Sequence, residues 1–144
     1  MKDELVWALA FDFPRLYTGL RKTYTYAHFQ GVNCADGWEP IVRWLSGQIE
    51  RLIELESLEE QELYRAIEVR ERHGGLEFYM NDATEDMQKL IGSAVAESFS
   101  VCEFCGHQGV LRQPNRRGPK TLCSDCFGKV IVLPAQRLVP NQRI

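Results

Sequence analysis

The sequence has no long hydrophobic run, and no apolar stretch approaches the roughly 20 residues that a membrane-spanning helix needs. Its opening stretch carries Asp12 among apolar residues and has no small-residue cleavage site, so we expect no signal peptide. Neither an H-E-x-x-H pair nor the glycine-rich loops G-x-x-x-x-G-K-[ST] and G-x-G-x-x-G occur. The sequence therefore gives no support for a metalloprotease, a P-loop protein or a dinucleotide-binding protein. Since we expect neither a membrane-spanning helix nor a signal peptide, we expect a protein of the cytoplasm that contacts no membrane.

Groups for catalysis are also scarce. The three histidines, His28, His73 and His107, do not assemble into a His-Asn-His nuclease pattern. Cys34 is the remaining candidate nucleophile, but no motif around it would lower its pKa by a known route. We expect Cys34 to be a small buried residue. Since no nucleophile–base pair can be named, we expect the protein not to be an enzyme.

The composition is that of a globular protein, with 144 residues, 44% hydrophobic and 26% charged. This length suits one domain, or one domain plus a small module. The net charge of −3 is unevenly divided. Residues 1–100 carry 10 Lys and Arg against 18 Asp and Glu, a net −8, whereas residues 101–144 carry 7 against 2, a net +5. Such a split has two interpretations: the two parts meet different partners, or they attract each other across an internal interface.

The N-terminal segment is expected to form a helix over residues 2–12 that Pro14 ends, because Leu5, Trp7 and Leu9 fall near helical spacing. Residues 18–35 show no clear period and predict a loop with short extended pieces.

Residues 36–55 predict the first of two main amphipathic helices. Asp36 is expected to cap its start and Glu39 to complete a capping box. One face is apolar, comprising Ile41, Trp44, Leu45, Ile49, Leu52 and Ile53. Ser57 with Glu60 repeats the capping pattern and predicts a short helix after it.

Residues 64–80 allow two structures. Apolar residues alternate with charged ones on both sides of His73-Gly74-Gly75, which predicts a β-hairpin whose two glycines supply the positive φ of the turn. The alternative is that the preceding helix continues to about residue 72 and ends at the glycines.

Residues 81–100 predict the second main helix, with Asp82 as cap, Glu85 completing the box, and an apolar stripe of Met87, Leu90, Ile91, Ala94 and Val95. The carboxylates of Asp82, Glu85 and Asp86 suit a helix start, where negative charge is favoured, so we do not expect a metal site there. This helix leads almost directly to Cys102, which predicts a rigid connection.

The strongest pattern is C-x2-C-x17-C-x2-C, formed by Cys102, Cys105, Cys123 and Cys126. Thiolates two residues apart can face one ion from a tight turn, and Gly106 lets the chain turn after the first pair. Two such pairs complete the tetrahedron of a structural zinc site with one Zn²⁺ ion. Four thiolates leave no position for water, so we expect this zinc to be structural and His107 to be a surface or hydrogen-bonding residue.

Residues between and after the cysteine pairs predict two short strands, a Pro- and Gly-rich turn and a short helix, the order of a treble-clef-like or zinc-ribbon module. Four basic residues and no acidic one lie between the pairs: Arg112, Arg116, Arg117 and Lys120. They are candidates for contacts to nucleic-acid phosphates. No Phe, Tyr or Trp lies within 106–122 to stack on bases. The predicted fold is therefore α+β, with an acidic body (1–100), a four-cysteine zinc module (101–132) and an extended tail (133–144).

Five motifs in one order also resemble a family of small uncharacterised proteins of tailed bacteriophages and prophages: FPRLY, GVNCADGW, VRERHGGLEFY, AESFSVCEFCGHQGVLR and KTLCSDC. The resemblance spans most of residues 13–126. It implies the hairpin, the four cysteine ligands, a bacterial host cytoplasm and an accessory phage role. The chain departs from the family pattern at His73 and Glu77, where the family has an aromatic residue and Arg, so a basic surface there is not carried over.

Two functions remain for these features. The first is a non-enzymatic protein that binds a host or phage protein, in counter-defence or host regulation, with the acidic body competing for a basic groove. The alternative is nucleic-acid binding by the basic loop of the zinc module. An enzyme is the third and least supported class.

Overall fold

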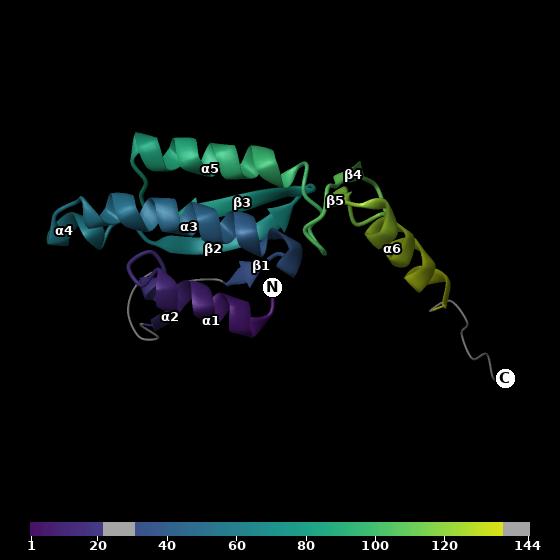
Figure 1. Ribbon diagram of the computed structural model, residues 1–144, viewed down its shortest axis with the longest axis horizontal. Helices are drawn as coiled ribbons and strands as arrows, with labels where there is room; N and C mark the ends of the chain where they lie inside the picture. Colours follow the sequence, from purple (N-terminus) through teal and green to yellow (C-terminus); the bar gives the residue numbers. More distant parts are fainter. Residues whose placement is uncertain (22–30, 137–144) are drawn as a thin grey trace.

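The computed structural model describes residues 1–21 and 31–136, and the side chains of 1–20 and 31–131. It confirms an α+β fold with several helices and two small sheets (Figure 1). In the body, strands β1 (Val32–Asn33), β2 (Ala66–Arg72) and β3 (Gly75–Met80) form a sheet in that order. β1 runs parallel to β2, and β3 antiparallel to it. In the C-terminal part, β4 (Val110–Arg112) and β5 (Lys120–Leu122) form a separate antiparallel pair.

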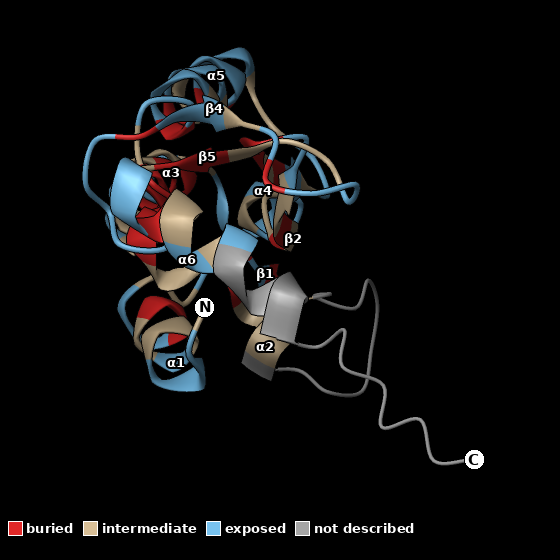
Figure 2. Ribbon diagram, turned by 90° about the vertical axis from the view of Figure 1, so that its right-hand side faces the viewer, coloured by how far each residue is buried: buried red, intermediate tan, exposed pale blue. Residues whose placement is uncertain are grey.

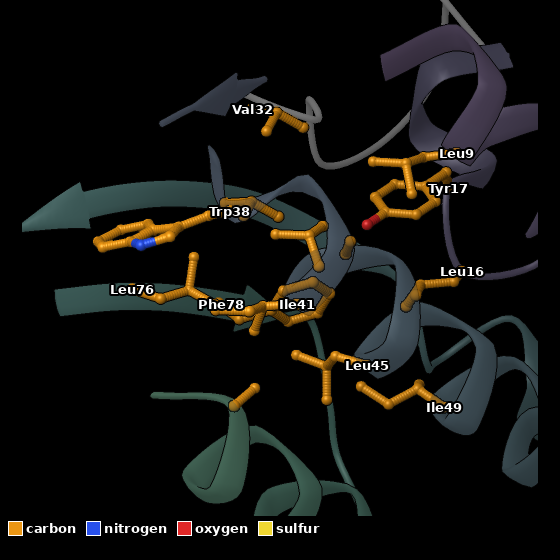
Figure 3. Packing of buried hydrophobic residues seen from close by; sticks show 14 of the residues in the cluster. Leu9, Leu16, Tyr17, Val32, Trp38, Ile41, Leu45, Ile49, Leu76 and Phe78 are labelled. Carbon is orange, nitrogen blue, oxygen red and sulfur yellow. The ribbon is translucent and has the colours of Figure 1, made fainter. Parts of the chain in front are cut away.

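The first main helix is α3 (Glu39–Glu54), which packs against both the sheet and α5 (Glu85–Ser98). Figure 3 shows Phe78 of β3 next to Ile41 of α3, and Leu76 of β3 next to Trp38. Each of these four side chains is at most 6% exposed. Figure 2 shows the buried residues gathered between these layers, while the outer side of α5 is exposed. The apolar face predicted for residues 36–55 therefore forms the centre of the core, except that Trp44 is 45% exposed.

Both predicted capping boxes of the main helices are wrong in position. Asp36 lies in a 3₁₀ turn (Asp36–Trp38) before α3, and its carboxylate accepts a hydrogen bond from the backbone N–H of Lys2 at 2.8 Å instead. At α5 the cap is Thr84, whose hydroxyl accepts from Met87 N–H at 3.3 Å, and not Asp82. The box predicted at Ser57 is confirmed, since Ser57 accepts from Glu60 N–H at the start of α4 (Leu58–Gln61).

The N-terminal segment forms α1 (Asp3–Asp12), which ends just before Pro14 as predicted. A short helix α2 (Thr18–Arg21) follows, so the predicted loop is wrong for these residues; the extended piece is confirmed at β1, and residues 22–30 lie outside the described part. Glu50 of α3 is buried and accepts hydrogen bonds from the backbone N–H groups of Arg15 and Leu16 at 3.0 and 2.8 Å. The FPRLY motif is thereby fixed to the C-terminal half of α3.

The hairpin is confirmed, and the alternative of a long helix through residue 72 is wrong. Its turn differs by one residue from the prediction. His73 (φ 53°) and Gly74 (φ 85°) are the two central residues, and Gly75 already belongs to β3, paired with Arg72. Positive φ at both central residues is the type I′ geometry whose twist matches that of the strands.

Helix α6 (Ser124–Gln136) is longer than the short helix predicted after the second cysteine pair. The extended tail predicted from residue 133 is therefore wrong for residues 133–136, which continue the helix. Residues 137–144 lie outside the described part. Figure 1 shows α6 projecting from the end of the molecule that carries β4 and β5.

Candidate metal centre

The first cysteine pair sits in a tight turn between α5 and β4. An isolated bridge between Val101 and Gln108 closes the base of this turn. Within it, Cys102 N–H donates to the His107 carbonyl at 2.7 Å, and Gly106 N–H donates to the Cys102 carbonyl at 2.9 Å. Gly106 has φ +79°, a conformation that side chains with a Cβ rarely adopt. The glycine after C-x-x-C therefore allows the turn, as predicted.

The second pair lies where β5 meets the start of α6. Cys123 directly precedes the helix, and Cys126 belongs to its first turn. Phe127 N–H donates to the Cys123 carbonyl at 3.0 Å, and Cys126 N–H donates to the Cys123 sulfur at 3.4 Å. Short strands, a turn and a helix thus present both cysteine pairs to one point, an arrangement compatible with a zinc-ribbon-like module.

The four Sγ atoms of Cys102, Cys105, Cys123 and Cys126 lie within 4.8 Å of one another. The Cys105 and Cys123 sulfurs are 3.6 Å apart, and all four cysteines are free of disulfides. A tetrahedron with Zn–S bonds of about 2.3 Å has S···S edges of about 3.8 Å, so this spacing fits four thiolates around one metal ion. His107 is exposed and its Nδ1 lies 3.2 Å from the Cys105 sulfur, which confirms it as a hydrogen-bonding surface residue beside the four-cysteine group.

Backbone amides favour the thiolate form at the first cysteine. Burial opposes ionisation of Cys102, but N–H groups of Cys123, Cys105 and Phe104 point at its sulfur and lower its pKa to about 7. At Cys126, burial first and then the neighbouring sulfurs raise the pKa to about 12. Metal binding requires deprotonated thiols, and neighbouring thiolates repel one another. A cation held among the four sulfurs would offset this repulsion.

The body of the protein grips the main chain of the first cysteine turn. Trp38 is fully buried, and its indole Nε1–H donates to the Val101 carbonyl at 2.8 Å. Gly37 lies so close that a Cβ there would be 2.6 Å from the Glu103 carbonyl carbon and closer still to the carbonyl oxygens of Cys102 and Glu103. The GVNCADGW motif thus ends in two residues, Gly37 and Trp38, that contact the backbone of the first cysteine turn.

A buried carboxylate completes this contact. Glu103 is 3% exposed; one of its oxygens accepts from Ala35 N–H at 3.1 Å, and the other from the Lys120 ammonium at 2.9 Å. Lys120 also donates to Glu71 of β2 at 2.9 Å. Burial opposes the charge of Lys120, but the two carboxylates outweigh it and raise its pKa. Lys120 therefore joins Glu103 of the first cysteine turn to the hairpin.

The double-glycine turn of the hairpin meets the same module. Thr121 is fully buried and its hydroxyl donates to the Gly74 carbonyl at 2.6 Å. A Cβ on Gly75 would overlap the ring of Phe99, which follows α5. The turn therefore packs closely against both β5 and the end of α5.

The four basic residues proposed for phosphate contacts have different surroundings. Lys120 lies against the acidic body. This contact agrees with the interpretation that the acidic and basic parts of the chain attract each other across an internal interface. The Arg112 guanidinium donates to the Leu122 carbonyl and to Ser124, and lies 5.1 Å from the centre of the Phe127 ring. Arg116 and Arg117 are exposed in the turn between β4 and β5. Only these last two present their charge outward.

The other candidate groups fall elsewhere. Cys34 is 4% exposed, which confirms it as a buried residue, and burial raises its pKa to about 12. Asp82, Glu85 and Asp86 are exposed at the start of α5, and in the described part of the chain the four cysteines alone form a group spaced for a metal ion.

No protein-family model, curated protein or solved structure matches this chain. Within residues 1–21 and 31–136, no helix has both the length and the apolar character needed to cross a bilayer. The site must therefore be interpreted from its own geometry.

Sequence reasoning identified the cysteines but missed the groups that fix them to the body: Gly37, Trp38, Glu71, Glu103 and Thr121. The motifs GVNCADGW and RHGG did contain a signal for close backbone packing, because each supplies a glycine that lies against the cysteine module. Their meeting point could not be found without the fold, because Ala35 and Glu103, for example, are separated by 68 residues.

Proposed function

We propose that this chain is a non-enzymatic accessory protein that binds another protein and holds its C-terminal module in place with one structural Zn²⁺ ion. Zinc is the ion that best suits four thiolates in a tetrahedron, because soft sulfur ligands and this geometry favour it over magnesium, calcium or manganese. A closed set of four protein ligands has no open position for a substrate, which supports a structural role.

The observation that carries the protein-binding function is an aromatic surface on α1, consisting of Trp7 and Phe11. These side chains are 58% and 75% exposed and lie one helical turn apart. They line a surface hollow of about 480 Å³ together with Ala8, Glu4 and Asp12. Exposed tryptophan and other large aromatic residues are typical anchors of protein interfaces, and the flanking carboxylates favour a partner with basic groups around an apolar centre.

The resemblance to proteins of tailed bacteriophages and prophages supports a place in the cytoplasm of a bacterial host. A partner with a basic groove is then a host or phage protein, and competition for that groove serves counter-defence or the regulation of a host enzyme.

Affinity capture from host lysate, with and without nuclease, tests this function. We expect a specific protein to be recovered in both conditions and to be lost with Trp7→Ala/Phe11→Ala. Leu55→Ala/Leu58→Ala is the matched control, because these two side chains are 82% and 83% exposed elsewhere on the surface. Recovery of no specific protein, or equal recovery with the α1 variant, would contradict the proposal.

Nucleic-acid binding is the second candidate function, supported by the outward charge of Arg116 and Arg117. With two phosphate contacts, the logarithm of the affinity should fall with the logarithm of salt concentration at a slope of about −2. A gel-shift series in increasing salt, with Arg116→Glu/Arg117→Glu as the variant, tests it. Equal retention of nucleic acid by the wild type and this variant would remove the candidate.

A further inference from the structure

Strand β3 is an edge strand, and part of its backbone faces away from the sheet. Within the described part of the chain, β2 is its only neighbouring strand. Val69 of β2 donates its N–H to Gly31, on the β1 side, so its partner Phe78 cannot receive that group. Residues alternate between bonded and non-bonded pairs in an antiparallel ladder. The N–H and C=O of Phe78 therefore point outward from the sheet.

Two other contacts fix the same alternation. Leu76, two residues before Phe78, donates its N–H outward to the Ser98 hydroxyl of α5 at 2.9 Å. Asn81 donates its N–H inward to the Arg65 carbonyl at 2.9 Å, so the preceding residue, Met80, directs its own N–H outward. Ser98 thus occupies the edge at one end, whereas Phe78 and Met80 offer free backbone groups among the described residues.

A groove of about 500 Å³ follows this edge, between β3 and α5. Its lining comprises Phe78, Tyr79, Met80, Asn81, Asp82, Ala83, Gln88, Ile91 and Gly92. Gly92 stands on the helix side of the groove, and a Cβ built there meets no atom within 4 Å. In Figure 1, α5 runs beside β3 on the side of the molecule opposite α1, so this groove is separate from the aromatic surface.

We propose that this groove binds an extended peptide segment of a partner protein, which pairs with β3 as a fourth strand. Outward backbone groups supply the hydrogen bonds, as in other cases of strand addition. Met80 and Ile91 offer apolar contacts to alternate peptide side chains. Asp82 is the only charged lining residue, so the peptide carries a Lys or Arg at the end that reaches it.

A second copy of this chain fits the groove less well than a single peptide strand. Each copy has its own α5 beside β3, so two copies meeting edge to edge would have to accommodate two helices at the contact. A single peptide strand brings no such helix with it.

The experiment selects a library of random short peptides on the zinc-loaded full-length protein and compares wild type with Gly92→Gln, whose side chain fills the groove. Gly128→Gln is the matched control, because Gly128 is also helical with no atom within 4 Å of a built Cβ. We expect enriched peptides with alternating apolar residues and a basic end. Gly92→Gln should weaken their binding by at least about tenfold, and Gly128→Gln should leave it unchanged.

Methylating the backbone nitrogens of a selected peptide at alternate positions distinguishes strand pairing from side-chain binding. Methylation of one of the two alternate sets of nitrogens should abolish binding, whereas methylation of the other set should not. The amide signals of Phe78 and Met80 should shift when the unmodified peptide binds. Absence of groove-dependent peptides, equal binding after methylation of either set, or a dimer that Gly92→Gln disrupts would each overturn the proposal. Since Trp7 and Phe11 lie elsewhere, Trp7→Ala/Phe11→Ala should leave peptide binding intact, which separates this result from the proposed function.

Discussion

The contact between Gly37 and the first cysteine turn predicts a large effect from the smallest possible substitution, Gly37→Ala. The added Cβ would lie 2.6 Å from the Glu103 carbonyl carbon, whereas ordinary contacts begin at 3.4 Å. The carbonyl oxygens of Cys102 and Glu103 would lie closer still, so the turn must move by at least about 0.8 Å, and all three atoms belong to backbone that cannot rotate away. Such overpacking typically costs about 1–3 kcal/mol.

This movement should also weaken the bonds that join the turn to the body. The indole of Trp38 and the N–H of Ala35 reach the turn at 2.8 and 3.1 Å, so a displacement of this size takes both beyond good hydrogen-bond geometry. We expect a loss near the upper end of the range, about 3 kcal/mol. With a urea dependence of about 2 kcal/mol per molar, the unfolding midpoint should fall by about 1.5 M.

Urea unfolding of the zinc-loaded protein, followed by circular dichroism, measures the effect. Gly92→Ala is the matched control, because its Cβ meets nothing and alanine is preferred in a helix, so it should stabilise by up to about 1 kcal/mol. If Gly37→Ala were as stable as wild type, the body would not grip the cysteine turn as described, and the attachment inferred from Gly37, Trp38 and Glu103 would be refuted.

Three further predictions concern the metal and the buried groups. Purified protein should contain one zinc per chain by elemental analysis, and strong chelation or Cys105→Ser should unfold residues 100–130; unchanged circular dichroism with unchanged metal content would contradict this. Because the folded pKa of Lys120 is raised, its stabilising contribution is fully present below the unfolded value of about 10.4 and is lost as pH rises through the folded value. The stability difference between wild type and Lys120→Met should thus be constant from about pH 7 to 9 and shrink above about pH 10.5; a difference that does not change with pH would show that the ammonium charge is irrelevant. Cys34, buried and with a pKa raised to about 12, should resist iodoacetamide at about pH 8 until urea unfolds the chain, and rapid labelling of the folded protein would show that its site opens readily.

Local sequence patterns predicted the elements whose causes are local. The cysteine turns follow from C-x-x-C with Gly106, and the hairpin follows from alternating residues around two glycines. Ser57 caps α4 because both partners lie within one turn of the chain. In these cases the residues that determine the structure are neighbours in sequence, so no knowledge of the tertiary fold is required.

The errors occur where distant groups compete for the same atoms. Asp36 has the sequence position of a cap, but its carboxylate is used by Lys2, 34 residues away. Lys120 resembles a surface cation, but its partners Glu71 and Glu103 are 49 and 17 residues away. At the hairpin, positive φ falls on His73 and not on Gly75, because the register of β2 and β3 determines which two residues form the turn. The outcomes at Asp36 and Lys120 depend on residues far away in the sequence, whereas the turn position depends on the register of the whole hairpin, residues 66–80.

Because the cysteine module is attached to the body, a metal ion bound by the four cysteines should stabilise the body as well as the module. The body contacts the residues that flank the cysteines. Trp38 donates to the Val101 carbonyl, and Gly37 packs against the backbone of Cys102 and Glu103. Ala35 and Glu71 bond to the side chains of Glu103 and Lys120. A metal that fixes this backbone therefore also fixes the surface against which α3 and the hairpin turn pack. Losing the ion should lower the unfolding free energy of the body as well as that of the module. The two exposed arginines, Arg116 and Arg117, take no part in these contacts, so their substitution should change neither.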